Sequence, residues 1–304
     1  MLQIIVELIK LASLIITLNK SMACADRVAG ILAVKSSMTY VNDEMRQKEK
    51  KQNHTPAVKF DHVTFTYAGA GAPSLKDISF QAMPGETIGI IGGTGSGKST
   101  LVSLIPRFYD PQENVTEYSR KSIGEKVGIV QQRSVLFQGS IRDNLKWGDE
   151  NATDEDIWKA IEIAQAKEVV EGKMGKLDFQ LEQNGRNLSG GQKQRLTIAR
   201  ALVKKPEILI LDDSASALDF ATDAALRKAI HGLEGKMTTF LVSQRVAGIK
   251  QADKILVLGN GELAGQGTHE ELMKNCEVYQ KIYYSQFPEE KLREKINYDE
   301  KGEA

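Results

Sequence analysis

The sequence has 304 residues, 41% of them hydrophobic, so it can bury a large core and hold one or two domains. Its 40 lysines and arginines balance its 40 aspartates and glutamates, and this neutrality provides no electrostatic attraction to nucleic acid. Two cysteines and four histidines are scattered, without a disulfide framework or metal-ligand spacing, which favours a reducing, cytoplasmic setting.

The first 18 residues are mostly apolar, and no proline or glycine interrupts them, so a helix is predicted. The run is short for a complete membrane span and carries Glu7 and Lys10, and it lacks the basic start and cleavage site of a signal peptide. We expect residues 1–34 to be the cytoplasmic end of a membrane helix and its amphipathic extension. An ordinary helix packed on the domain is the alternative.

Residues 35–57 are polar and charged and are predicted to form a solvated linker. Alternating apolar and polar residues from Val58 to Tyr67 predict a strand, and residues 78–80 predict a second one. A Pro-Gly turn at residues 84–85 then leads into an apolar run.

Residues 92–100 contain the pattern G-x-x-x-x-G-K-[ST] between an apolar strand-like run and an apolar helix-like run. This is the context of a phosphate-binding P-loop, in which glycines let backbone N–H groups surround an anion at a helix N-terminus. Lys98 is expected to reach the β- and γ-phosphates, and the Ser99 hydroxyl to bind Mg²⁺. The residues predicted to bind nucleotide here are Gly92, Thr94, Gly95, Ser96, Gly97, Lys98, Ser99 and Thr100.

Beyond the P-loop, Tyr-Asp-Pro at residues 109–111 is predicted to stop the helix. A short strand at residues 127–130 follows, residues 141–171 favour helix, and Leu-Ser-Gly-Gly-Gln at 188–192 opens a further helix that ends before Pro206. Short apolar runs then alternate with helical segments, which predicts an α/β fold with a mostly parallel sheet.

Three of these later runs cover residues 207–213, 238–242 and 254–258. Asn260-Gly261 after the last run is a strong β-hairpin signal, and a Thr-x-x-Glu capping box at residues 268–271 begins the C-terminal helices.

Leu211-Asp212 at the end of an apolar run is a Walker B pattern, and the Asp212 carboxylate is expected to hold Mg²⁺ opposite Ser99. Asp213 follows directly and could polarise an attacking water. Two acids after a strand are often only the start of a loop, but their position downstream of a P-loop favours the catalytic interpretation.

The segment Leu188, Ser189, Gly190, Gly191 and Gln192 joins a hydroxyl, two glycine N–H groups and a helix N-terminus, which makes a second phosphate site. A simple helix cap would also fit locally, but not beside a P-loop and a Walker B pattern. This pentapeptide resembles the signature of ATP-binding-cassette (ABC) proteins. In that family the signature faces the γ-phosphate held by another cassette, so two ATP molecules join two cassettes head to tail.

The resemblance extends over a domain at residues 58–287. It implies a P-loop NTPase (RecA-like) core, an antiparallel β subdomain and a helical subdomain at about residues 133–195, preceded by one long helix and followed by a charged tail at 288–304. It also implies that Tyr67 stacks on adenine and that Gln132, in the Q-loop, contacts Mg²⁺ and a membrane domain. The D-loop is matched by Ser216, Ala217, Leu218 and Asp219.

Three features depart from the family pattern. The family usually has Glu after the Walker B aspartate, and Asp213 holds its carboxylate one methylene closer to the backbone, out of line with a water placed for Glu. Gln244 replaces the switch histidine and cannot carry a positive charge. The loop at residues 111–127 is shorter than usual, and a strand pair normally found there is missing.

The first two departures resemble the degenerate half of a heterodimeric exporter, and residues 135–145 look like the exporter type. The resemblance implies a truncated half-transporter at the cytoplasmic face of the membrane, with ATP and Mg²⁺ as cofactors and a second half-transporter as partner. Its membrane domain would lie outside this chain. The expected catalytic residues are Asp213, Gln244 and Gln132, and the expected Mg²⁺ ligands are Ser99, Gln132 and Asp212.

Two alternatives remain open. One is a regulatory module that holds ATP without turning it over, which the changes at Asp213 and Gln244 favour. The other is a soluble cassette in DNA repair or translation, which the neutral charge and the apolar N-terminus disfavour.

Overall fold

The chain divides into two compact units, residues 1–39 and residues 40–304. In the first unit, α1 (Leu2–Leu32) is a single helix of 31 residues, which confirms the long helix expected before the domain, and many of its apolar side chains are exposed. Within the described part of the chain, none of the helices combines the length and the hydropathy that a membrane crossing needs. The computed structural model describes residues 2–34, 55–110, 120–214, 217–233 and 237–290.

The second unit is built on a six-stranded sheet with the strand order β10-β9-β3-β8-β7-β4. Neighbouring strands are parallel except β9 and β10, which form the predicted hairpin. Asn260 and Gly261 in its turn have φ values of 52° and 80°, as a type I′ turn requires. The predicted α/β class is therefore confirmed. The strands are β3 (Thr87–Gly92), β4 (Val127–Val130), β7 (Ile208–Asp212), β8 (Thr238–Val242), β9 (Lys254–Gly259) and β10 (Glu262–Gly267).

Two small antiparallel sheets accompany the large one. The β2 strand extends beyond the predicted residues 78–80, because Leu75 and Ala82 at its ends are also buried and continue the pattern of inward-facing side chains. The pairs are β1 (Val58–Phe65) with β2 (Leu75–Ala82) and β5 (Gly139–Ser140) with β6 (Gln180–Leu181).

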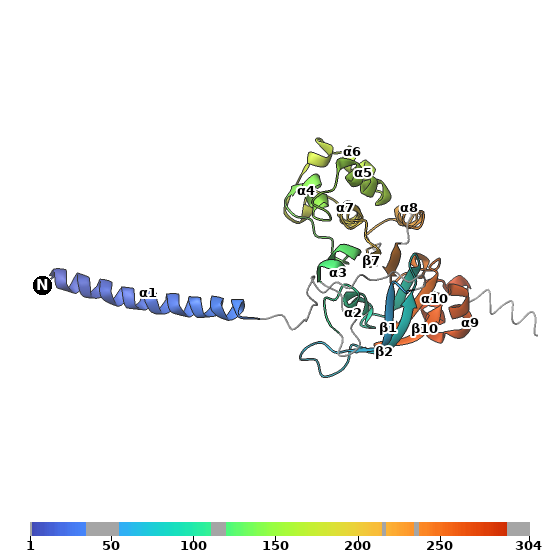
Figure 1. The fold of residues 1–304 in the computed structure, drawn as a ribbon, viewed down its shortest axis with the longest axis horizontal. Coiled ribbons are helices and arrows are strands. Elements are labelled where there is room, and N and C mark those ends of the chain that lie inside the picture. The colour runs from blue at the N-terminus through green and yellow to red at the C-terminus, as the bar shows by residue number, and fades with distance from the viewer. Residues whose placement is uncertain (1, 35–54, 111–119, 215–216, 234–236, 291–304) are drawn as a thin grey trace, which may run out of the picture. The chain divides into compact units, whose positions relative to one another are not determined.

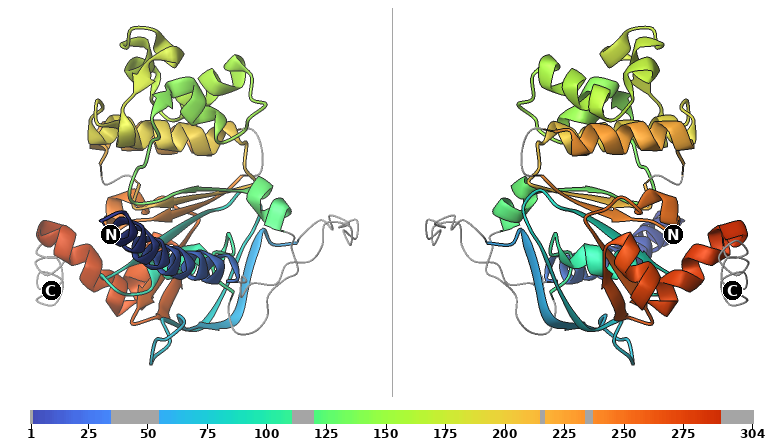
Figure 2. Two further views of the ribbon diagram at one scale, coloured as in Figure 1. Left: turned by 90° about the vertical axis from the view of Figure 1, so that its left-hand side faces the viewer. Right: turned by 90° about the vertical axis from the view of Figure 1, so that its right-hand side faces the viewer.

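The two faces of the large sheet are covered by different elements. On one face, Ile88 and Ile90 of β3 pack with α2 (Lys98–Leu104) and the β1–β2 pair. Ile91 of the same strand belongs to the opposite face and packs among the C-terminal helices, drawn in orange and red in Figure 2. This division follows from the alternation of side chains along a strand. The C-terminal helices are α9 (His269–Asn275), which begins at the predicted capping box, and α10 (Glu277–Gln286).

A group of helices between β4 and β7 interrupts the alternation and gathers at one end of this unit (Figure 1). The helical stretch predicted over residues 141–171 is divided into three helices. One reason is that Thr153 starts a new helix with its own capping box, and another is that Gln165 has a φ of 56°. These helices are α4 (Ile141–Lys146), α5 (Asp154–Ile163) and α6 (Lys167–Glu171), followed by α7 (Gly190–Val203).

The remaining helices are short or flank the sheet. The helix after the P-loop ends at Leu104, so the stop predicted at residues 109–111 is too late. Arg107 already has a φ of 52°, which a helix does not accommodate. The other helices are α3 (Arg120–Lys126), α8 (Phe220–His231), η2 (Lys176–Asp178), η3 (Gln183–Gly185) and η4 (Val246–Gly248).

Some predicted segments lie wholly or partly outside the described residues. The missing strand pair expected after residue 113 falls in a part of the chain that the structure does not describe, so it stays a prediction. The segments concerned are most of the linker at 35–57, part of the loop at 111–127, Ser216 of the D-loop and most of the tail at 288–304.

Candidate functional site

The P-loop leaves the end of β3, which lies between β8 and β9 in the sheet, and enters α2. Gly97, directly before α2, has a φ of +99°, and a Cβ there would lie 2.7 Å from Leu75 Cδ2. A Cβ on Gly92, at the start of the loop, would overlap the carbonyl oxygen of Leu258. Both fixed glycines of the motif are therefore required by the geometry of the loop.

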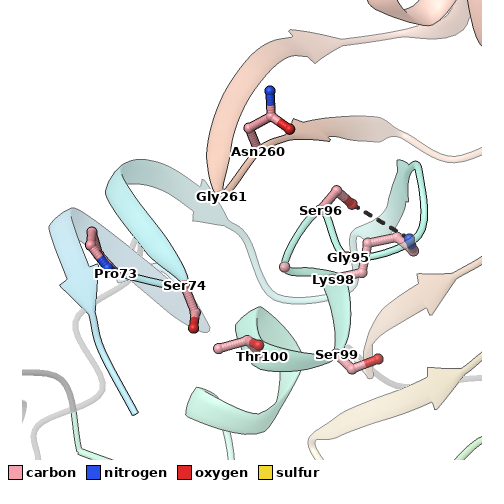
Figure 3. Close-up of a pocket in the computed structure, with 10 residues that line it drawn as sticks. Pro73, Ser74, Gly95, Ser96, Lys98, Ser99, Thr100, Asn260 and Gly261 are labelled. Atoms are coloured by element: carbon pink, nitrogen blue, oxygen red, sulfur yellow. Dashed lines mark hydrogen bonds between the residues drawn. The ribbon is translucent and has the colours of Figure 1, made fainter. Parts of the chain in front are cut away.

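Lys98 bends back over the P-loop. Its Nζ donates to the carbonyl oxygens of Gly92 at 2.8 Å and Gly93 at 2.7 Å, and it lies 3.5 Å from Ser96 Oγ (Figure 3). Burial lowers the pKa of Lys98, and the negative charges of two nearby aspartates oppose this shift. The ammonium group is thus held at the mouth of the loop, where phosphate oxygens could replace the carbonyl oxygens.

An open pocket of about 400 Å³ lies beside the P-loop (Figure 3). Its walls come from the P-loop, from Pro73 and Ser74 before β2, and from the Asn260-Gly261 turn between β9 and β10. A pocket of this size beside backbone donors suits part of a nucleotide. Sequence patterns predicted the P-loop wall, whereas the two other walls were recognisable only as turns.

Asp212, the last residue of β7, lies beside the P-loop serine. Ser99 Oγ donates to Asp212 Oδ1 at 3.5 Å, because parallel strands bring their carboxyl ends to the same edge of the sheet. Burial raises the pKa of Asp212, and the hydrogen bond from Ser99 opposes this shift. A half-buried carboxylate beside a hydroxyl is an oxygen-donor pair that a Mg²⁺ ion would stabilise, so these residues fit that ion.

Asp213 turns sharply after β7, with a φ of 47° and with its backbone N–H donating to the Val242 carbonyl at 3.0 Å. Its Oδ2 accepts a hydrogen bond of 3.3 Å from Gln132 Nε2. Burial raises the pKa of Asp213, while the charges of Arg245 and Lys98 oppose this shift. The pairing of Asp213 with Gln132 was not predictable from either motif.

Tyr67 follows β1 and reaches the P-loop helix. Its hydroxyl donates to Thr100 Oγ1 at 3.2 Å. Its ring has edge contacts with Phe65 and Tyr109, whose centroids lie 4.8 Å and 5.0 Å away. These contacts hold an aromatic ring beside α2, where a residue that stacks on adenine is expected.

The signature stands at the start of α7. Ser189 Oγ accepts from the Gln192 N–H at 3.3 Å, and Gln192 Oε1 accepts from the Ser189 N–H at 3.1 Å, which forms a capping box. A Cβ on Gly191 would lie 3.1 Å from the Ala217 carbonyl oxygen, so the signature adjoins the D-loop. Among the described residues, no hydrogen bond joins the signature to the P-loop.

Two further predicted residues, Gln244 and Asp219, lie at the end of a strand and at the start of a helix. Gln244 follows β8 and is exposed, and its backbone carbonyl accepts from Gln286 Nε2 at 2.7 Å. Asp219 of the D-loop caps α8, accepting from the Thr222 N–H at 2.9 Å and the Thr222 hydroxyl at 2.8 Å. The structure therefore brings the P-loop together with Asp212, whereas the signature is part of a separate helical region.

Residues 75–216 match the protein family described as ABC transporter. This chain carries an ABC transporter ATP-binding domain. It is 40% identical to the uncharacterized ABC transporter ATP-binding protein YfiB of Bacillus subtilis over 285 residues, which are 91% of this chain and 48% of YfiB. It is also 41% identical over 238 residues to the β-(1→2)glucan export ATP-binding/permease protein NdvA of Rhodopseudomonas palustris, covering 76% of this chain and 40% of NdvA.

A solved structure of a bacterial Atm1-family ABC exporter with ATP bound is similar to the ABC domain in fold. The TM-score is 0.72 at 34% sequence identity, and the match covers 75% of this chain and 41% of the exporter chain. The chain spans about half the length of the curated relatives it matches. The predicted family and P-loop NTPase fold are thereby confirmed.

Proposed function

We propose that this chain is the ATP-binding subunit of an ABC exporter, acting at the cytoplasmic face of a membrane. The main support is the meeting of Lys98, Ser99 and Asp212 around the P-loop pocket. The similarity to NdvA, an export ATP-binding/permease protein, adds support for transport.

Each residue of the site has a role in this proposal. The P-loop N–H groups and Lys98 hold the phosphates, while Tyr67 stacks on adenine. Ser99, Asp212 and Gln132 supply the oxygens around Mg²⁺, which would neutralise charge on the phosphates when bound. These side chains would orient the nucleotide in the open pocket beside the P-loop.

The proposal includes slow hydrolysis at this chain's own site. The Asp213 carboxylate accepts a hydrogen bond from Gln132 and sits on a side chain one methylene shorter than that of Glu. A base in this position is poorly aligned with a water placed for Glu, and an error of about 1 Å can cost roughly 100-fold in rate. Gln244 cannot replace the charge of a switch histidine.

The unaltered signature supports a role for this chain in a partner's site. Ser189 and the first N–H groups of α7 form a phosphate-binding helix N-terminus that has no hydrogen bond to this chain's own P-loop within the described residues. We therefore propose head-to-tail pairing with a second half-transporter. Its P-loop would place ATP against residues 188–192.

A regulatory module that binds ATP without turnover is the second candidate. The same two residues, Asp213 and Gln244, favour it. The two candidates coincide if the chain works in a heterodimer, because a slow site can still hold the dimer closed.

ATP binding is tested by changing the P-loop lysine in the purified full chain. Lys98→Met removes a charged donor at the phosphates, so the dissociation constant of ATP should rise by about 10- to 100-fold. Lys59→Met, at an exposed surface lysine paired with Asp61, is the control and should bind ATP like the wild type. Equal affinities of the two variants, measured by fluorescence titration, would contradict the proposed site.

A further inference from the structure

The C-terminal helix α10 reaches the segment after β8 through one side chain. Gln286 Oε1 accepts from the Val246 N–H at 2.9 Å, and Gln286 Nε2 donates to the Gln244 carbonyl oxygen at 2.7 Å. A glutamine amide carries a donor and an acceptor at the same end, so one side chain satisfies both backbone groups. The amide therefore clamps residues 244–246 on both sides of Arg245.

The clamped segment is also fixed from within. Ser243 Oγ donates to the Arg245 carbonyl at 3.0 Å and accepts from the Arg245 N–H at 2.9 Å. Val246 is fully buried, whereas the side chains of Gln244 and Arg245 remain exposed. The backbone is thus held while two polar side chains project from it.

Arg245 connects this segment to the elements around the Walker B end. Its guanidinium lies 5.4 Å from the ring centroid of Phe220, the first residue of α8. Burial raises the pKa of Asp223 in the same helix, and the charges of Arg227 and then of Arg245 oppose that shift. Arg245 therefore packs against the first residue of α8.

The base of the clamp is firmly packed. Tyr279 of α10 is fully buried, and its hydroxyl is 2.8 Å from His269 Nδ1 of α9. Tyr283, one turn further along, is also buried in the same cluster. Because α10 is anchored in the domain core, Gln286 is held in place and can fix the backbone of residues 244–246.

We propose that Gln286 is a positioning residue, which fixes the backbone of residues 244–246 and so holds Gln244 at the switch position and Arg245 against Phe220 at the start of α8. The inference rests on the proposed function, since it concerns turnover at the same site. On this proposal, α10 affects ATP turnover through Gln286, although no residue of α10 lines the P-loop pocket.

The test compares three variants of the full chain. Gln286→Leu removes both hydrogen bonds, and Gln286→Glu keeps the acceptor for the Val246 N–H but loses the donor to the Gln244 carbonyl. Ser285→Ala is the matched control, because the exposed Ser285 hydroxyl donates to the Ile282 carbonyl of its own helix at 2.7 Å and has no other hydrogen bond within the described residues. Single-turnover ATP hydrolysis, ATP affinity, melting temperature and amide hydrogen exchange are measured for each.

Gln286→Leu should lower the hydrolysis rate about 10-fold while ATP affinity changes less than about 2-fold, because only the placement of the segment is lost. Exchange at the Val246 N–H should become faster in Gln286→Leu and stay slow in Gln286→Glu, although the glutamate variant also hydrolyses slowly. Ser285→Ala should match the wild type in all four measurements.

Two results would overturn the inference. One is a hydrolysis rate for Gln286→Leu equal to that of Ser285→Ala, and the other is unchanged exchange at Val246. Failure of the wild type to bind ATP would instead overturn the proposed function, and the exchange measurement would still decide whether the clamp exists.

Discussion

At the P-loop, single side chains from distant segments determine what the loop can hold. Lys98 and Ser99 come from the loop itself, whereas Asp212 arrives from β7 and Tyr67 from the end of β1. The motif residues were predictable because their spacing is local. The Gln132–Asp213 hydrogen bond was not, since it depends on how β4 and β7 pair and on the left-handed turn at Asp213.

Tyr67 provides a prediction at this scale. Tyr67→Ala should raise the dissociation constant of ATP about 10-fold, because aromatic stacking on a base is worth roughly 1–3 kcal/mol. Tyr67→Phe loses only the hydrogen bond to Thr100 and should bind ATP within about 2-fold of the wild type. Isothermal titration of both variants checks this, and an alanine variant with wild-type affinity would exclude Tyr67 from the site.

At the scale of elements, buried strands were the most predictable part of the fold. Their short apolar runs matched β4 and β8 to the residue, because both faces of the sheet are covered. Helix ends were less predictable. The breaks at Arg107 and Gln165 occur at non-glycine residues with positive φ. Neither position holds a proline or glycine that would predict a break from the sequence.

The two glycines at the start of α7 allow a matched test of the signature and the D-loop. Gly191→Ala should destabilise the domain by about 1–3 kcal/mol, because its Cβ would press on the Ala217 carbonyl. Gly190→Ala should leave stability unchanged or slightly higher, because no atom lies within 4 Å of a Cβ there and alanine favours helix. Urea unfolding compares them, and equal destabilisation would contradict the close approach at Gly191.

Contacts between elements account for what the sequence did not reveal about the site. The pocket walls at Ser74 and Asn260 and the clamp at Gln286 join segments far apart in the chain. Ser74 and Gln286 belong to no sequence motif, and Asn260 was recognisable only as part of a hairpin turn. Only the packing of the elements around β3 and β8 brings Ser74 and Asn260 to the P-loop pocket and Gln286 to the segment after β8.

At the scale of the whole molecule, the chain combines an unaltered signature with altered residues at positions 213 and 244. The signature at residues 188–192 has a capped helix N-terminus, whereas Asp213 and Gln244 stand where the family usually has Glu and His, which is the basis of the proposed slow hydrolysis. In a pair of identical chains, each unaltered signature would face a weakened site. Changing Asp213 to Glu and Gln244 to His should therefore raise the rate of ATP hydrolysis without any other partner.

The most direct test is steady-state ATP turnover by the purified full chain and its Asp213→Glu/Gln244→His double variant, at saturating Mg²⁺ and ATP. The account predicts slow turnover by the wild type and at least about a 10-fold increase in the double variant, since a correctly placed general base and acid contribute roughly 100-fold or more. Lys98→Met in the same background should abolish the increase. Fast, cooperative hydrolysis by the wild-type chain alone would contradict the account.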